Sequence, residues 1–277
     1  MRGANHWLRI AIIWFVVSVI VEFLVLKAPI PFPTMSEQAE GITQTGYMLF
    51  LVGAPIFVFV WVMLLYCIIA FRRRGPTEPP PVPRPDSNVI LLLWAAISFT
   101  IVIFLAGWGT FTLHEITEPN GPHPLNIQVI GQQWYWTYRY PSYGGMETKA
   151  LYLPTNTPIK FNITSLDVVH SLWIYPLDVK EDAVPGVSTT AYVDVHPHTP
   201  NFTAHINAIC NELCGLYHGY MHGAVYIRPK ATFAAWAQKQ EAKERASGLL
   251  KNLPPYSLIY YPTANSFTPP PPQDQSP

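Results

Sequence analysis

Two apolar runs without a charged residue constrain the fold of this chain more than any other feature. Residues 47–71 and 89–110 contain no Asp, Glu, Lys or Arg, and about 20 consecutive apolar residues in a helix are enough to cross a bilayer. Pro55 lies inside the first run and predicts a kink, which membrane-embedded helices tolerate. The two runs therefore predict a transmembrane helical hairpin over residues 45–112.

The segment between the two runs predicts the orientation of the hairpin. Arg72, Arg73 and Arg74 directly follow the first run, and arginines that flank membrane helices concentrate on the cytoplasmic side. The rest of this Pro/Arg loop is rich in proline, which favours an extended chain over a helix. Both outer ends of the hairpin are therefore expected on the non-cytoplasmic side.

A third apolar run, residues 10–26, follows two arginines, as the core of a signal peptide would. Glu22 interrupts this run, and Pro29 makes the sequence after it a poor cleavage site. We favour an uncleaved membrane anchor over residues 1–28, with a cleaved signal peptide as the alternative. Both place the chain that follows the hairpin outside the cytoplasm.

The sequence pattern changes after the hairpin. Short alternating stretches rich in Val, Ile, Tyr and Thr, separated by Pro, Gly and Asn, predict an all-β sandwich over residues 120–232. Mixed charges predict a surface helix over 233–252, and a proline-rich tail follows over 253–277. Because 17 Lys and Arg balance 17 Asp and Glu, the net charge argues against a nucleic-acid-binding protein.

A cluster of soft metal ligands lies near the end of the predicted sandwich. The segment C-N-E-L-C-G-L-Y-H-G-Y-M brings two thiols, an imidazole and a thioether into twelve residues, and a second imidazole lies upstream at His170. Such ligands select copper over magnesium or calcium. One blue-copper ion would need only two histidines, one cysteine and a weak methionine, so a thiolate is left over. Two thiolates bridging two coppers would use every group.

A structural zinc site is the alternative for this cluster, because two cysteines and two histidines form a common zinc ligand set. That interpretation leaves Met221 without a role. A disulfide between Cys210 and Cys214 is also open from the residues alone, although the histidine and methionine that follow favour a metal.

Four sequence blocks then point to a known family. They are G-Q-Q-W-Y-W-T-Y-R-Y, D-V-V-H-S-L-W, K-E-D-A-V-P-G and the cysteine segment, in this order after the hairpin. The chain resembles subunit II of haem–copper cytochrome c oxidases over about residues 47–230. The resemblance implies N-terminal transmembrane helices followed by a cupredoxin-like sandwich that carries the dinuclear copper centre CuA.

The resemblance also implies the site residues. The copper ligands would be His170, Cys210, the backbone carbonyl of Glu212, Cys214, His218 and Met221. The Glu212 side chain would bind Mg at the contact with subunit I, which suits a hard carboxylate ligand. Trp134 would receive electrons, Asp167 would lie on the face that docks cytochrome c, and Asp182 would lie near subunit I.

The function implied by the resemblance is electron transfer in a respiratory terminal oxidase. Cytochrome c or a similar carrier would reduce the copper centre, and haem in subunit I would then reduce oxygen to water while protons are translocated. The oxygen-reducing site would thus lie on another chain. The implied location is a bacterial-type plasma membrane with the copper domain on the periplasmic side. A subunit of a nitric oxide reductase, or a copper-free quinol oxidase subunit, are the alternatives.

Two positions depart from the pattern of the family. Arg139 stands in Y-R-Y where many members have Y-E-Y, which predicts a docking face less suited to a basic cytochrome c. Leu91 stands three residues before Trp94 where many members have a glutamate near a proton channel of subunit I. We therefore expect a different proton route or a divergent oxidase.

Overall fold

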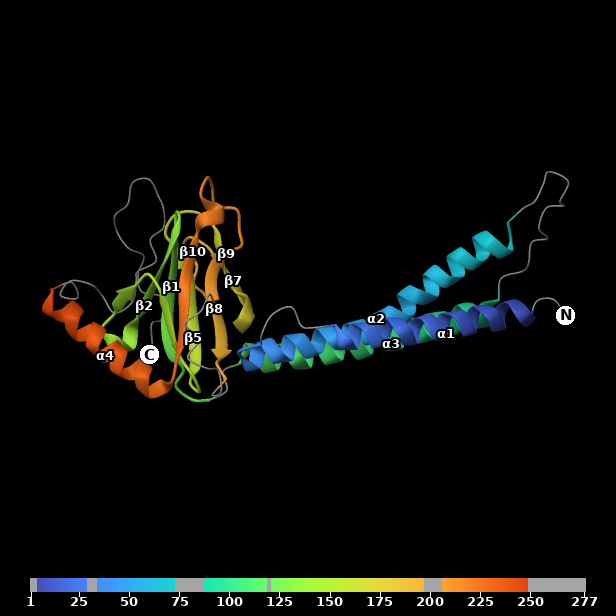
Figure 1. Ribbon diagram of the computed structural model, residues 1–277, viewed down its shortest axis with the longest axis horizontal. Helices are drawn as coiled ribbons and strands as arrows, with labels where there is room; N and C mark the ends of the chain where they lie inside the picture. The colour runs from blue at the N-terminus through green and yellow to red at the C-terminus, as the bar shows by residue number, and fades with distance from the viewer. Residues whose placement is uncertain (1–3, 29–33, 73–86, 119–120, 197–205, 249–277) are drawn as a thin grey trace. The chain divides into compact units, whose positions relative to one another are not determined.

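The computed structural model describes residues 4–28, 34–72, 87–118, 121–196 and 206–248. The chain divides into two compact units, coloured by residue number in Figure 1. A helical unit combines Met1–Pro31 with Thr43–Leu113, and a sandwich unit combines Phe32–Ile42 with His114–Pro277. The predicted Pro/Arg loop after Arg72 and the proline-rich tail lie outside the described residues.

Three long helices form the membrane-type part of the chain. They are α1 (Ala4–Lys27), α2 (Glu37–Ala70) and α3 (Asn88–Thr117). Each is long and apolar enough to cross a membrane, with mean hydropathies of 2.5, 2.6 and 2.8 over an 18-residue stretch of each helix. Apolar side chains cover their surfaces, as expected of helices whose solvent is lipid. Three apolar helices therefore precede the β domain.

Helix α1 is joined to α2 by two polar contacts. The indole N–H of Trp14 donates to the carbonyl of Pro55 at 2.8 Å, and the Nδ1 atom of His6 lies 2.7 Å from the Tyr66 hydroxyl. These two contacts place α1 against the second half of α2. In an apolar surrounding such hydrogen bonds hold neighbouring helices in register.

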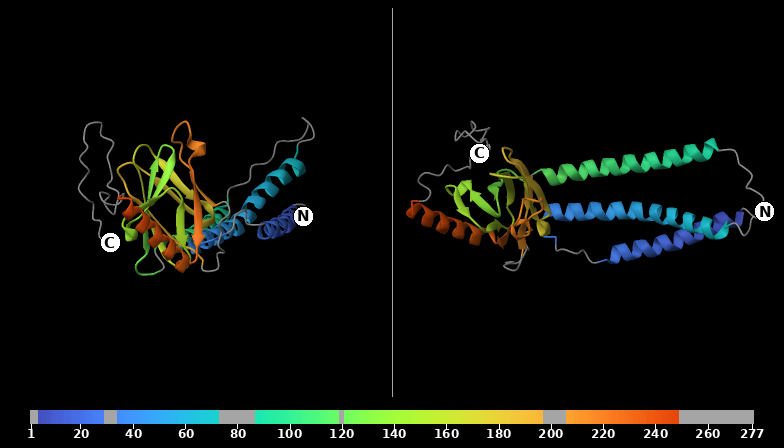
Figure 2. Two further views of the ribbon diagram at one scale, coloured as in Figure 1. Left: turned by 60° about the vertical axis from the view of Figure 1, so that its left-hand side comes forward. Right: turned by 90° about the horizontal axis from the view of Figure 1, so that it is seen from above.

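The sandwich consists of two five-stranded sheets (Figures 1 and 2). The first has the order β3 (Met146–Thr148), β2 (Tyr135–Tyr140), β1 (Leu125–Gln132), β5 (Pro158–Ser165) and β8 (Thr189–Asp194). The second has the order β4 (Leu151–Pro154), β10 (His222–Arg228), β9 (Ile206–Cys210), β6 (His170–Ile174) and β7 (Val179–Ala183). The β1–β5 and β4–β10 pairs are parallel, and the other pairs are antiparallel.

The core lies between the two sheets. Side chains of β5 and β10 alternate between buried and partly exposed, which is the period of a strand with one face covered. Phe161 and Ile163 on one sheet, and Val225 and Ile227 on the other, are at most 2% exposed. The predicted class, apolar N-terminal helices followed by an all-β cupredoxin-like sandwich, is confirmed.

Helix α4 (Lys230–Ala246) covers one edge of the sandwich. Its Trp236 stacks on Tyr152 with ring centroids 3.9 Å apart, and its buried Glu244 accepts a hydrogen bond from the backbone N–H of Glu147. The helix starts three residues before the predicted 233 and ends at Ala246 instead of reaching 252. Gly248 adopts φ 75°, the left-handed conformation that commonly terminates helices.

The residues just before and at the start of α2 belong to the sandwich unit. The N–H of Met35 donates to the Pro176 carbonyl at 2.8 Å, and the N–H of His196 donates to the Met35 carbonyl. The buried Gln38 side chain donates to Asp194 and accepts from its backbone N–H, both at 2.8 Å. These contacts fasten residues 35–38 to the end of β8.

Candidate metal centre

One end of the second sheet brings the predicted ligands together. His170 begins β6 and Cys210 ends β9. Leu172, two residues after His170, is paired with Cys210 across these strands. The side chains of His170 and Cys210 therefore lie near each other. The segment that follows Cys210 turns through a short 3-10 helix, η3 (His218–Tyr220), and returns as β10. The N–H of Cys210 donates to the Met221 carbonyl at 3.0 Å, which closes this loop on itself.

The two thiols and two imidazoles form a chain of close contacts. The Sγ atoms of Cys210 and Cys214 are 3.8 Å apart. The Nδ1 atom of His170 lies 3.7 Å from the sulfur of Cys210, and that of His218 lies 3.6 Å from the sulfur of Cys214. Each thiol therefore has its own imidazole.

Two weaker donors complete the cluster. The Met221 sulfur lies 3.8 Å from the Cys214 sulfur, and the backbone carbonyl of Glu212 lies 3.3 Å from the Cys210 sulfur. Met221 is 1% exposed and Cys214 is 3% exposed. The donor set is soft, buried and arranged around the two thiols, so it fits a copper centre.

Asp167 holds one of the imidazoles in place. Its Oδ1 atom is 2.9 Å from the Nε2 atom of His170 and also accepts from the N–H of Val168. Its Oδ2 atom accepts from the N–H of Gln133 at 2.7 Å. Burial alone would raise the pKa of Asp167, but these N–H donors lower it below its usual value. A carboxylate on the far nitrogen of a histidine fixes its ring orientation and leaves Nδ1 free for a metal.

The two thiols differ in their protonation. Burial opposes ionisation of Cys210, but its contacts with His170 and with the backbone of Ser171 lower its pKa to about 6. Burial and the neighbouring Cys210 charge raise the pKa of Cys214 to about 12. Burial opposes protonation of His170, but Cys210 and Asp167 raise its pKa. Without metal, the pocket thus favours a single thiolate, at Cys210.

Trp134 lies against the ligand loop. Its indole N–H donates to the carbonyl of Cys214 at 3.1 Å, and its ring meets Tyr217 edge-on with centroids 4.9 Å apart. The Gln133 side chain donates to the same carbonyl at 2.8 Å. The role of Gln133 was missed by sequence reasoning, although its position beside Trp134 in the G-Q-Q-W block was the available signal.

The other predicted positions lie outside this cluster of donor atoms. The side chains of Glu212 and Asp182 are exposed. Arg139 was expected to make the docking face less suited to a basic cytochrome c. Instead it is 5% exposed and forms an ion pair with Glu147 at 2.6 Å. An arginine that is buried and paired contributes little charge to a docking face. Trp136 is a core residue, and its ring lies beside His170.

Gly131 leaves space for His170, and the sequence did not single it out. A Cβ atom at this position would lie 2.9 Å from Cδ2 of His170 and 3.1 Å from Trp136. We predict that Gly131→Ala lowers copper retention and destabilises the protein by about 1–3 kcal/mol, the usual cost of overpacking. Copper content and denaturant unfolding of the full-length protein measure both effects.

Gly219→Ala is the matched control, because nothing lies within 4 Å of the added Cβ atom there. It lies on the ligand loop between His218 and Tyr220, so it tests whether any added methyl group near the site has the same effect. Equal copper loss in the two variants would contradict the prediction.

Comparisons with known proteins find similar chains. Residues 145–227 match the family described as "Cytochrome C oxidase subunit II, periplasmic domain". Cytochrome c oxidase subunit 2 of Thermostichus vulcanus is 25% identical over 263 residues, covering 75% of this chain and 77% of the relative. A probable cytochrome c oxidase subunit 2 of Rickettsia bellii is 28% identical over 252 residues, covering 82% of this chain and 90% of the relative.

A solved structure is similar to part of the chain. The periplasmic domain of subunit II of cytochrome oxidase from Bradyrhizobium japonicum is 28% identical, with a TM-score of 0.40, and the match covers 44% of this chain and 97% of that one.

Fold and site together define a cupredoxin-like domain that carries a donor set suited to copper and is preceded by apolar helices. The chain is similar to cytochrome c oxidase subunit II proteins, both in the match to the periplasmic-domain family and in its relatives. The resemblance drawn from the four sequence blocks is thereby confirmed.

Proposed function

We propose that this protein is the electron-transfer subunit of a respiratory terminal oxidase and that its cluster binds two copper ions as a CuA centre. The pairing of each thiol with its own imidazole carries this proposal. Two metals bridged by both thiolates would each receive one histidine. When bound, the copper pair would supply a centre that takes up and releases one electron.

The surrounding residues have distinct roles in this proposal. Cys210, Cys214, His170 and His218 would hold the copper ions, and Asp167 orients His170 through Nε2. The weak donors are the sulfur of Met221 and the carbonyl of Glu212. Because these groups are already close together within a packed sheet end, they change position little when the charge of the site changes.

Trp134 is the proposed point at which electrons enter. Its ring is part-exposed, and its N–H donates a hydrogen bond to the carbonyl of Cys214, which would hold copper. A side chain with one side toward solvent and the other on a ligand residue can couple a docked donor to the site. Cytochrome c is the donor suggested by the names of the relatives.

The surface around the ligand loop favours docking through apolar contacts. Leu213, Leu216 and Tyr220 are 79%, 81% and 75% exposed, and exposed apolar side chains gathered on one surface mark protein-binding sites. Asp167 contributes less charge here than expected, since both its oxygens accept hydrogen bonds within the domain. Its docking role stays a prediction, and Arg139 is no longer a reason to expect a less basic donor.

The remaining partner roles are proposed from the family. The exposed Glu212 carboxylate would bind magnesium at the contact with subunit I, and Asp182 would lie near that contact. Oxygen reduction to water and proton translocation would take place on subunit I. The proposed orientation places the sandwich on the periplasmic side of a bacterial plasma membrane, with the segment after Ala70 in the cytoplasm.

We also propose that α1 is retained as a membrane anchor. Its hydrogen bonds from Trp14 to Pro55 and between His6 and Tyr66 support this over a cleaved signal peptide, because a segment that is removed needs no specific register with α2. The intact mass of the purified protein distinguishes the two outcomes.

The spectrum of the copper-loaded, full-length protein tests the proposed centre. We expect a purple colour, two copper ions per chain and an electron paramagnetic resonance signal from one unpaired electron shared by both ions. A colourless protein that retains one zinc ion, or a signal from a single isolated copper ion, would overturn the proposal.

A further inference from the structure

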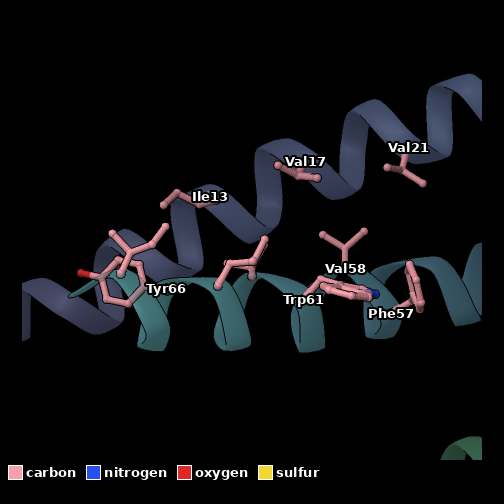
Figure 3. Close-up of a pocket in the computed structure, with 10 residues that line it drawn as sticks. Ile13, Val17, Val21, Phe57, Val58, Trp61 and Tyr66 are labelled. Carbon is pink, nitrogen blue, oxygen red and sulfur yellow. The ribbon is translucent and has the colours of Figure 1, made fainter. Parts of the chain in front are cut away.

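A groove with apolar walls runs between α1 and α2, entirely within the helical unit (Figure 3). Its volume is about 500 Å³. Side chains that line it are Ile13, Val17 and Val21 from α1 and Phe57, Trp61 and Ile69 from α2. The three α1 residues are spaced by four, so they share one helix face, and Figure 3 shows them directed toward α2.

The length of this groove matches one leaflet of a bilayer. Phe57 and Ile69 are twelve residues apart, which corresponds to ~18 Å along a helix at about 1.5 Å per residue. One leaflet contributes ~15 Å to a hydrocarbon core about 30 Å thick. Ile69 is three residues before Arg72, so the groove begins near the arginine side of the membrane and ends near its middle.

Positive charges lie at the mouth of the groove. His6 contacts both Tyr66, at 2.7 Å, and the ring of Phe71, at a centroid distance of 5.1 Å. Arg9 is about one turn beyond His6, and Arg72 directly follows Phe71; both arginines are exposed. Arginines on this side of the helices are expected in the cytoplasmic headgroup layer.

We propose that the groove binds an anionic phospholipid of the cytoplasmic leaflet, with one acyl chain between α1 and α2 and the phosphate at Arg9 and Arg72. Close packing of a partner helix favours small residues, which let backbones approach, whereas Val, Ile, Phe and Trp form these walls. A flexible acyl chain fits such an irregular apolar groove, and basic residues at its mouth attract an anionic headgroup. The inference is independent of copper and requires only that α1 is retained.

Filling the groove tests the acyl-chain part. The oxidase complex is purified in mild detergent from a membrane that contains phosphatidylglycerol, and its bound lipid is quantified by native mass spectrometry. Val17→Phe is expected to lower tightly bound phospholipid at least about 5-fold, because the larger side chain occupies the groove. Val19→Phe is the control, since Val19 is 50% exposed on the same helix and does not line the groove.

Removing charge tests the headgroup part. Arg72→Gln is expected to reduce the preference for phosphatidylglycerol over phosphatidylcholine about 5-fold, the effect of one basic residue near an anionic surface. Arg73 and Arg74 remain to maintain the orientation of the helices. Lys27→Gln, at the other end of α1, should leave the preference unchanged.

Three results would overturn the proposal. They are equal lipid retention in Val17→Phe and Val19→Phe, an unchanged headgroup preference in Arg72→Gln, and a photo-crosslinker at position 17 that attaches to another polypeptide. The last result would assign the groove to a partner helix or to a second copy of the chain. Crosslinking to phospholipid would support the proposal directly.

Discussion

Cys210→Ser is expected to abolish the dinuclear copper signal and the electron flow from donor to oxygen. Its thiol contacts His170, Cys214 and the carbonyl of Glu212, so three of the other donor groups lie directly against it. A serine hydroxyl is a hard oxygen donor that cannot replace a bridging thiolate. Copper retention should fall by more than about 100-fold, since loss of an outer partner of a metal ligand already costs ~10–100-fold.

The controls for this prediction separate the site from the fold. Cys67→Ser changes an exposed thiol on α2 and should leave copper binding and turnover unchanged. Cys214→Ser should behave like Cys210→Ser, because the two thiols are proposed to act as a pair. A shared-electron copper signal that persists in either bridging variant would refute the dinuclear assignment, provided that assembly with the other subunits is normal.

Trp134→Phe should slow electron delivery from cytochrome c by at least about tenfold, which corresponds to ~1.4 kcal/mol of activation free energy. Phenylalanine keeps an aromatic ring against Tyr217 but removes the N–H that donates to the Cys214 carbonyl. Stopped-flow reduction by cytochrome c measures the effect. The optical spectrum of the copper centre should change little, because Trp134 is not itself a ligand.

Two comparisons make the Trp134 result specific. Trp236→Phe changes an aromatic residue of α4 that stacks on Tyr152 in the same domain, and it should leave the reduction rate unchanged. A small artificial reductant that needs no docking should reduce the Trp134→Phe variant at nearly the original rate. If cytochrome c reduced this variant as fast as the unchanged protein, electrons would have to enter elsewhere.

Several parts of the site could be predicted because they depend on residues near each other in sequence. Cys210, Cys214, His218 and Met221 fall within one short loop, so their spacing alone brings four side chains to one place. The membrane helices depend on local hydropathy in the same way. His170 is forty residues before Cys210, and it was assigned only through its sequence block.

Other features depended on neighbours that are remote in sequence. The pairing of Arg139 with Glu147 follows from the register of β2 and β3, which placed a suspected docking residue in a buried ion pair. The hydrogen bonds from Gln133 to Asp167 and to Cys214 bridge 34 and 81 residues. The groove between α1 and α2 likewise depends on which faces of two helices meet.

The amino-acid sequence by itself determined that the chain has apolar helices, a β domain and a soft-metal loop, because hydropathy, strand alternation and ligand spacing are local properties. Only the tertiary structure decided that each thiol is paired with one imidazole, that Asp167 orients His170, and that Gly131 must lack a side chain. Those features are distances between groups that the strands and the ligand loop bring together. Such distances are set by sheet register and side-chain packing, which no single segment of the sequence contains.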